Sequence, residues 1–168
     1  MKRIKLTQGK YAIVDDEDYG NLSKKKWRAA KAGKTYYAHS TEYLGKINGK
    51  FMENTICMHR EILGLRKGDG AIADHKNRNG LDNRKLNLRI VNAQQSVWNR
   101  TSSKLLKGVT SYKPRTKTEK MRWAARIMVN GKSLFLGCFK NAQESALAYN
   151  EAATKYYGEY AQLNKLNP

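Results

Sequence analysis

One stretch near the middle of the chain predicts a small fold and carries an unusual set of polar groups. Residues 73–89 read ADHKNRNGLDNRKLNLR. Ile72-Ala73 is typical of the end of a short buried strand, Asn79-Gly80 favours a turn, and Leu88–Val91 predicts a second strand. The following range, 92–99, predicts a helix with an asparagine as its N-cap. We therefore expect strand, loop, strand and helix in that order.

Two ionisable side chains of this stretch, Asp74 and His75, are adjacent at the expected mouth of the first strand. Hydrolysis of a phosphodiester needs a base that activates water. It also needs a hard cation, such as Mg²⁺, that neutralises charge on the phosphate and on the leaving oxygen. One imidazole and a few oxygen ligands are enough for both tasks. The pattern therefore predicts a one-metal nuclease site.

A simpler interpretation of the stretch is a polar loop with one capping Asp and one surface His, because Asn and Gly are common in turns. That interpretation does not explain why Asp and His stand side by side at a strand end, ahead of Asn87-Leu88-Arg89 and a helix. The other histidines are weaker candidates. His59, followed by Arg60, fits a structural or phosphate-contacting role better than that of a second base, and His39 carries no pattern.

The charge of the chain favours a polyanionic partner. Lys and Arg number 33 against 14 Asp and Glu, which leaves a formal net charge of +19 on 168 residues. Residues 1–66 hold 14 basic and 7 acidic groups, residues 67–104 hold 8 and 3, and residues 105–168 hold 11 and 4. An excess spread over the whole chain suits a protein that lies along double-stranded DNA. A basic RNA-binding protein of ribosomal type would explain the charge but not the Asp-His-Asn set.

Composition favours small folded modules. Hydrophobic residues make up 40% of the chain and only two residues are proline, which indicates folding rather than disorder. Cys57 and Cys138 are far apart, so we expect neither a structural zinc site nor a disulfide framework. No apolar run is long enough to span a bilayer, and the first residues lack the apolar core of a signal peptide. These features predict a cytoplasmic protein with no membrane partner.

The N-terminal part is expected to be rich in strands. Residues 3–6 and 11–14 predict paired strands, and the acidic run Asp15–Asp18 suits the start of a short helix toward Lys26, because acidic side chains complement a helix dipole. We prefer this capping role for the run over a metal site. The Gly-containing segment Lys46–Lys50 predicts a further hairpin, and a short helix is expected near residues 59–63.

The C-terminal part, after the polar linker Thr101-Ser102-Ser103, predicts a sheet backed by a helix. Apolar residues alternate with arginines over 122–129, Asn130-Gly131 favours a hairpin turn, and 132–139 predicts the returning strand. A helix is expected over about 142–157, ended by a glycine. The residues spaced to pack this helix on the sheet are Ala146, Tyr149, Ala153 and Tyr156.

Asp74-His75, Asn87-Leu88-Arg89 and the following helix resemble the HNH homing endonucleases, which mobile introns encode and phages often carry. Met58-His59-Arg60 is also similar to that family, and the N-terminal part resembles the leader in front of many phage HNH nucleases. The resemblance implies a ββα metal finger in which His75 is the general base and Asp74 a ligand of one Mg²⁺ or Mn²⁺ ion. It also implies that Asn87 orients the base or braces the loop.

The chain departs from the HNH pattern on the helix. The position at which the family has a metal-binding Asn or His falls at Ser96, and a serine hydroxyl is a weaker ligand than a carboxamide oxygen. The substrate phosphate would then have to contribute more of the metal binding. Asn99 lies three residues further on, on the same helix face, and is an alternative ligand.

The C-terminal part looks like the DNA-binding domain of plant ethylene-response factors, which also occurs behind HNH fingers in homing endonucleases. Lys107-Gly108-Val109, the range 123–127, Leu136–Phe139 and the range 146–153 carry this resemblance. In that family the sheet enters the major groove. The positions implied to face the groove are Thr110, Tyr112, Arg126, Met128, Ser133 and Phe135, with Arg115, Arg122 and Lys132 expected nearby for their charge. We expect further DNA contacts from Arg60, Arg89 and Arg100.

Together these observations predict a modular α+β protein. Its expected parts are a β-rich DNA-contacting region (1–66), the HNH finger (67–104) and an ethylene-response-factor-like domain (105–168). The expected function is site-specific DNA cleavage of the intron-homing type, in a bacterial or phage-infected cell, by a monomer or a weak dimer on DNA. The alternative is a sequence-specific DNA-binding protein that keeps the nuclease scaffold without turnover, and position 96 distinguishes the two.

Overall fold

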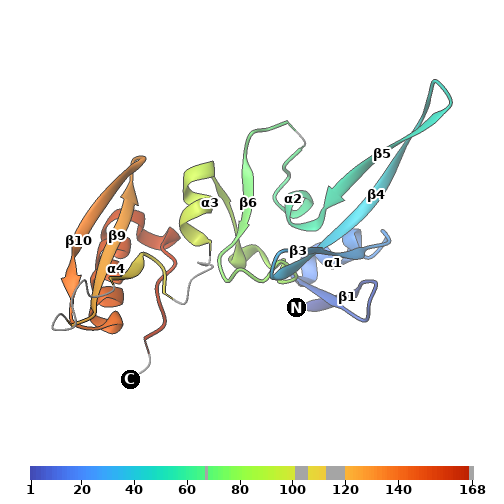
Figure 1. Ribbon diagram of the computed structural model, residues 1–168. Coiled ribbons are helices and arrows are strands. Elements are labelled where there is room, and N and C mark those ends of the chain that lie inside the picture. The colour runs from blue at the N-terminus through green and yellow to red at the C-terminus, as the bar shows by residue number, and fades with distance from the viewer. Residues whose placement is uncertain (67, 101–105, 113–119, 167–168) are drawn as a thin grey trace. The chain divides into compact units, whose positions relative to one another are not determined.

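The computed structural model describes residues 1–66, 68–100, 106–112 and 120–166 (Figure 1). It has the expected α+β class, with short helices and small antiparallel sheets. The chain divides into two compact units, Met1–Ser96 and Val97–Pro168. The N-terminal region and the expected finger up to Ser96 thus belong to one unit. Among the described residues, no helix has both the length and the apolar character that crossing a bilayer requires.

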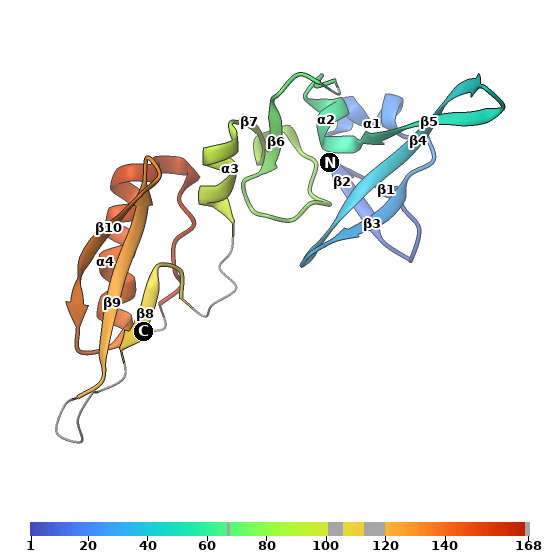
Figure 2. The ribbon, with the colours of Figure 1, turned by 45° about the horizontal axis from the view of Figure 1, so that its top comes forward.

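The first unit is built from three antiparallel sheets, β1-β2, β3-β4-β5 and β6-β7 (Figure 2). Its elements are β1 (Lys2–Lys5), β2 (Tyr11–Val14), α1 (Asp16–Leu22), β3 (Arg28–Ala32), β4 (Thr35–Ile47), β5 (Lys50–Cys57), α2 (Met58–Ile62), β6 (Ile72–His75), a 3-10 turn (Lys85–Asn87) and β7 (Leu88–Val91). The helix α3 (Ala93–Asn99) crosses the boundary between the units. The predicted β1-β2 pairing and the predicted hairpin between β4 and β5 are both confirmed.

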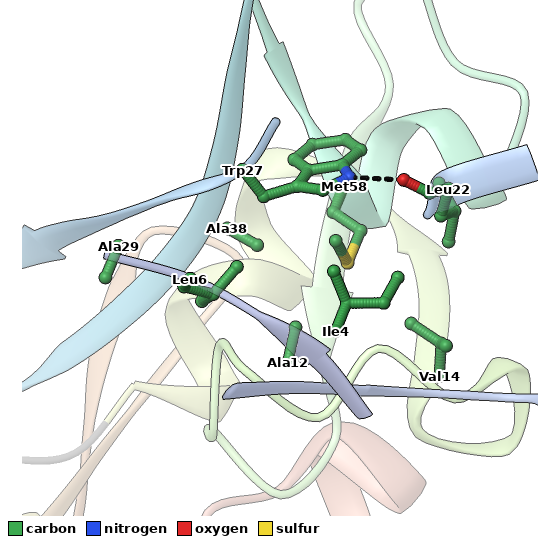
Figure 3. Close-up of a cluster of buried hydrophobic side chains, with 9 residues drawn as sticks. All are labelled: Ile4, Leu6, Ala12, Val14, Leu22, Trp27, Ala29, Ala38 and Met58. Atoms are coloured by element: carbon green, nitrogen blue, oxygen red, sulfur yellow. Dashed lines mark hydrogen bonds between the residues drawn. The ribbon is translucent and has the colours of Figure 1, made fainter. Parts of the chain in front are cut away.

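A compact apolar cluster holds β1, β2, α1 and the central sheet of the first unit together (Figure 3). Its buried members are Ile4, Leu6, Ala12, Val14, Leu22, Trp27, Ala29, Ala38 and Met58. Each larger side chain of this kind stabilises the fold by about 1.5–3 kcal/mol when it leaves water. Trp27 Nε1 donates a hydrogen bond of 2.7 Å to the Leu22 carbonyl. Because this bond satisfies the last carbonyl of α1, the helix ends at Leu22 and not near Lys26 as the sequence suggested.

The acidic run at the start of α1 connects the helix to a distant loop. The Asp15 side chain makes no capping bond within α1, and instead accepts from the Lys85 backbone nitrogen at 2.8 Å. Lys85 Nζ lies 2.6 Å from Glu17 and 3.4 Å from Asp18. The acidic first turn predicted from the sequence is present. Through these contacts the acidic run attaches the loop between β6 and β7 to the start of α1.

The predicted order of strand, loop, strand and helix over residues 72–99 is confirmed. In the antiparallel β6-β7 pair, Asp74 lies opposite Arg89. The expected N-cap of α3 is also present. Asn92 Oδ1 accepts from the Gln95 backbone nitrogen at 2.9 Å, and Gln95 Oε1 accepts from the Asn92 nitrogen at 3.0 Å. This reciprocal pair satisfies two backbone donors that a helix start otherwise leaves open.

The second unit is a three-stranded sheet, in the order β10-β9-β8, covered on one face by a helix. Its elements are β8 (Val109–Tyr112), β9 (Arg122–Val129), β10 (Lys132–Phe139), α4 (Ala142–Tyr157) and a 3-10 turn (Gly158–Tyr160). The predicted sheet, helix and terminal Gly158 are confirmed. A Cβ at Gly108 would lie 2.0 Å from the Tyr149 ring, so only glycine lets the start of the sheet approach α4 this closely.

The packing face of α4 differs from the prediction at one position. Ala146, Tyr149 and Ala153 are buried as expected, but Tyr156 is exposed and Tyr157 is buried in its place. Both tyrosines lie at the margin of the apolar stripe, so helical spacing alone does not choose between them. Partners decide. The Tyr157 hydroxyl donates to the Met128 carbonyl at 2.6 Å, and its ring stacks on Trp98 with the centroids 4.5 Å apart.

Candidate functional site

The imidazole of His75 is held at the end of β6 by a carboxamide from the following loop. His75 Nε2 lies 3.2 Å from Asn83 Oδ1, and both side chains are buried. Because a carboxamide oxygen only accepts, this orientation places the hydrogen on Nε2 and makes Nδ1 the basic nitrogen of the neutral ring. The loop that carries Asn83 is itself bonded to β2, with Ile13 donating to the Leu81 carbonyl and accepting from the Asn83 nitrogen, each at 2.8 Å.

Two further rings pack beside His75. The centroid of His59, from α2, lies 5.0 Å from that of His75, and the Tyr37 ring of β4 lies 5.7 Å from His75 and 5.5 Å from His59. His39 stacks on Tyr37, with the ring centroids 6.5 Å apart. The loop between β6 and β7 reaches Tyr37 because Gly80 has no Cβ, which would lie 2.7 Å from that ring.

Burial keeps these histidines neutral at physiological pH. It lowers the pKa of His59 to about 3, with the neighbouring His75 as the next cause. Burial also lowers the pKa of His75, and this effect outweighs the opposing influence of the Asn83 hydrogen bond and the Asp74 charge. The pKa of the Tyr37 phenol is raised, first by burial and then by Asp74. A neutral imidazole is the form that can accept a proton, so His75 has the protonation state a general base needs.

Asp74 points to a cation across the strand pair. Its Oδ2 lies 3.0 Å from Arg89 Nε, and the two side chains are only 15% and 9% exposed. A pair so largely enclosed holds both groups in one geometry, since leaving either charge alone would be costly. Arg89, expected to contact DNA, therefore has its guanidinium engaged within the first unit.

A hydrogen-bonded network organises the loop that follows His75. Asn87 Nδ2 donates to Asn77 Oδ1 at 3.0 Å and to the Asp82 carbonyl at 2.7 Å, while Asn87 Oδ1 accepts from the Asn77 nitrogen at 3.0 Å. Arg84 donates twice to Asp82, at 2.7 Å each, and the Arg84 hydrogen bond is the main reason that the pKa of Asp82 is lowered. Asn87 therefore makes the contacts of a loop brace.

The expected metal ligands offer a small set of oxygen donors. Asp74 supplies a carboxylate and Ser96, partly buried on α3, supplies a hydroxyl. Asn99 is buried and belongs to the second unit. In the part of the chain that the structure describes, no three His, Cys, Asp or Glu side chains gather around one point. An ion of the Mg²⁺ type keeps several waters and needs only one or two protein oxygens plus substrate phosphate.

The expected DNA contacts of the second unit lie on the exposed face of its sheet. The side chains in this position are Thr110, Tyr112, Arg122, Arg126, Met128, Ser133 and Phe135. Lys132, which was expected beside them for its charge, pairs with Val129 and so lies on the other face of the sheet. Arg126 lies between two rings, with Cζ 5.9 Å from the Tyr112 centroid and 5.6 Å from that of Phe135, and it donates to the Tyr112 hydroxyl at 2.8 Å. Arg115 lies outside the described residues, as does the linker 101–103.

The two remaining arginines differ in how they are held. Arg60 donates to the carbonyls of Ala71 and Arg66, so it closes the loop ahead of β6. Arg100 has an exposed side chain, and its carbonyl accepts from Lys107 Nζ at 2.9 Å.

Sequence reasoning missed four contributors to the site. Asn83, Asp82 and Arg84 lie in the highlighted stretch, but nothing in their spacing marked Asn83 as the partner of His75. Tyr37 is far upstream, and strand propensity is its only signal in the sequence. His59 was assigned a structural or phosphate-contacting role, and its burial beside His75 supports the structural one.

The chain is 28% identical over 160 residues to a protein of Acanthamoeba polyphaga mimivirus named an uncharacterized HNH endonuclease. The alignment covers 95% of this chain and 78% of that protein. The similarity supports a relationship to HNH nucleases and extends over both compact units. No protein-family model and no solved structure matches the chain.

Proposed function

We propose that the protein is a divalent-metal-dependent DNA endonuclease of the HNH type that cuts at specific sites, as in intron homing. The observation that carries the proposal is the buried, neutral His75, fixed by Asn83 through Nε2 and adjacent in sequence to Asp74. A solvated loop has no need to bury an imidazole in this way. The similarity to a protein named as an HNH endonuclease supports the same reaction class.

In the proposed reaction His75 Nδ1 takes a proton from the attacking water. The Asn83 carboxamide holds the ring, and its oxygen stabilises the positive charge that Nε2–H shares once the ring is protonated. Asn87 acts one step further away, because it fixes the loop from which Asn83 projects. These contacts are present without substrate, so the base does not have to be assembled when DNA binds.

Asp74 and Ser96 would hold the divalent ion, with Asn99 as the alternative to Ser96. When bound, the ion supplies charge neutralisation at the scissile phosphate and at the leaving 3′ oxygen. The Asp74–Arg89 pair has a function in this scheme: it fixes the direction of the carboxylate at the strand end. A single site cuts one strand at a time, so we expect nicking by a monomer and double-strand breaks only from two events.

Two surfaces support DNA as the substrate. An open hollow of about 460 Å³ on the loop of the first unit is lined by Lys76, Asn77, Arg84, Leu86 and Asn87, and its two cations suit phosphate. On the second unit, the exposed sheet face offers Arg126, whose guanidinium is already held by Tyr112. A held arginine binds a guanine edge with less loss of conformational freedom.

The alternative is a DNA-binding protein with an inactive nuclease site. The weak ligand at position 96 favours it, because a serine hydroxyl holds a metal ion less well than the Asn or His of the family pattern. Both proposals predict DNA binding, so only turnover separates them.

Cleavage of selected DNA tests the proposal directly. Duplexes that the full-length protein binds are first enriched from a randomised pool and cloned into a supercoiled plasmid. The plasmid is then incubated with the protein and Mg²⁺, with Mn²⁺, or with EDTA. The proposal expects nicked circles with either metal and none with EDTA. Tight, selective binding without nicking in either metal would favour the inactive alternative.

A further inference from the structure

One part of the first unit extends well beyond the site. Strand β3 pairs with β4 only over Thr35–His39, whereas β4 continues to Ile47 and pairs there with β5 alone. We call residues 41–55 the arm. The arm is a two-stranded ribbon that projects from the rest of the unit in both views (Figures 1 and 2). Such a ribbon has no sheet neighbour, and an isolated hairpin is only marginally stable in water.

The arm carries large apolar side chains that are exposed to solvent. Tyr43, Leu44, Phe51 and Met52 are 55%, 61%, 63% and 43% exposed. The rings of Tyr43 and Phe51 pack at 5.5 Å, and Lys46 Nζ lies 4.4 Å from the Phe51 centroid. Phe51 and Met52 point to opposite faces because side chains alternate along a strand. An apolar group of this size on a projecting element marks a binding surface.

Charge at the arm favours DNA over another protein copy. The outer part of the arm, residues 44–52, contains Lys46 and Lys50 and no acidic side chain, while Glu42 and Glu53 lie nearer the body of the unit. The whole first unit, residues 1–96, contains 20 basic and 10 acidic groups. A second copy would bring the same positive excess against itself, whereas phosphates would pair with the lysines.

The arm and the candidate site share one strand. Tyr37, whose ring lies 5.7 Å from that of His75, stands on the same continuous strand as Tyr43. Six residues of strand span roughly 20 Å. Gly45, at φ 111°, lies at the irregularity where the register shifts, and such bulges redirect the side chains beyond them.

We infer that the arm inserts its aromatic pair into the minor groove of the bound duplex, away from the cut, and partly unstacks the bases there. Apolar wedges flanked by cations distort DNA in this way and gain contact area from the bend. The lysines of the outer arm would bind the flanking phosphates. The two glutamates nearer the body would limit the depth of insertion by repulsion from the backbone. This inference rests on the proposed function for its substrate.

The test measures base unstacking, so it does not depend on cleavage. Duplexes selected by the full-length protein receive 2-aminopurine at successive positions, and fluorescence is read with Ca²⁺ in place of Mg²⁺. We expect a local rise in fluorescence that is lost in the variant Tyr43→Ser/Phe51→Ser. We also expect that variant to bind roughly tenfold or more weakly, as for the loss of a stacked aromatic. Tyr11→Ser, which removes another exposed ring of the same unit, is the matched control and should keep both signals.

Three outcomes would overturn the inference, and they differ in what they say about the proposed function. A fluorescence rise that persists in the double variant, or no rise anywhere in a bound duplex, removes the arm from DNA distortion and leaves the nuclease proposal intact. Absence of any selective DNA binding overturns both. Sedimentation without DNA that shows a dimer for the wild type and a monomer for the double variant would make the arm a surface for self-association.

Discussion

The two compact units use their polar side chains in opposite ways. In the first unit, the side chains that could take part in a reaction are turned inward. His75 is buried against Asn83, Asp74 is paired with Arg89, and Asn87 is bonded to its own loop. In the second, the sheet buries only its apolar face on α4, and Arg126 lies with its neighbours on the exposed face.

This difference is what a division of labour between cutting and reading would require. A base must be held in one position and one protonation state before substrate arrives, and burial in a bonded network provides both. A reading surface must present donors to base edges and therefore has to stay accessible.

The largest expected effect is on turnover. His75→Ala should lower the cleavage rate by about 10²–10⁴-fold, the usual contribution of a general base, and should leave DNA affinity nearly unchanged. Nicking rates and equilibrium binding are measured on the same selected duplex. Arg126→Ala is the companion variant, for which we expect a weaker DNA affinity and a nearly unchanged cleavage rate of bound DNA. Nicking by His75→Ala at the wild-type rate would remove the mechanism.

The next effect concerns acid stability of the first unit. The folded-state pKa of His59 is about 3, well below the usual 6.5. Below pH 6.5 the unfolded chain therefore binds a proton at His59 that the native unit does not bind. The contribution of neutral His59 to the free energy of unfolding is complete above pH 6.5. It falls by up to about 1.4 kcal/mol per pH unit as the pH drops toward 3. Urea unfolding from pH 7 to 4 measures this slope.

His59→Phe should flatten that slope, because the ring is kept and the titrating group is removed. His39 and His75, whose pKa values are also lowered, should keep part of the acid sensitivity in the variant. An unchanged slope would mean that His59 is not buried neutral in the native unit.

A smaller effect should distinguish reading from anchoring on the second unit. If Arg126 contacts a base edge, Arg126→Ala should cost about 1–3 kcal/mol of discrimination between the selected and a scrambled duplex. Arg122→Ala, on the same exposed face and expected near the DNA for its charge, should weaken both duplexes equally and reduce the salt slope by roughly one unit. Binding over a salt series measures both. Equal losses on the two duplexes for Arg126→Ala would make the sheet a basic anchor.

The smallest expected change is a gain of activity. Ser96→Asn should raise the nicking rate at low Mg²⁺, because a carboxamide oxygen is a better ligand than a serine hydroxyl, and the difference should shrink as Mg²⁺ increases. The titration of rate against Mg²⁺ shows it. If Ser96→Asn brings no gain and Asn99→Ala abolishes cleavage, the ligand on α3 is Asn99.

Much of the fold was predictable because its signals are local. Alternation over β9, the Asn130-Gly131 turn, the Asn92 cap and the strand-loop-strand order around His75 are each encoded within a few residues. The early end of α1 and the choice of Tyr157 over Tyr156 were not predictable. The end of α1 depends on how the Trp27 indole folds back onto the Leu22 carbonyl, and the choice of tyrosine depends on the Met128 carbonyl, which is distant in the sequence.

The candidate site was predictable only in its central residues. The adjacency of Asp74 and His75 is visible in the sequence, but the packing of Tyr37 and His59 against His75 depends on how β4 and α2 meet β6. Arg60 and Arg89 stood out by charge alone, and charge does not tell an exposed cation from one bonded within the loop or across the strands. Their DNA contacts stay predictions.

The most direct test of the division between the units is a map of cut positions. Full-length wild type, His75→Ala and Arg126→Ala are incubated with Mg²⁺ and a plasmid that carries one selected site, and all nicks are located by sequencing of the new ends. The account predicts nicks concentrated at the selected site for the wild type, none for His75→Ala, and nicks spread over the plasmid for Arg126→Ala. A sharp, unchanged cut position in Arg126→Ala together with persistent cutting by His75→Ala would contradict it.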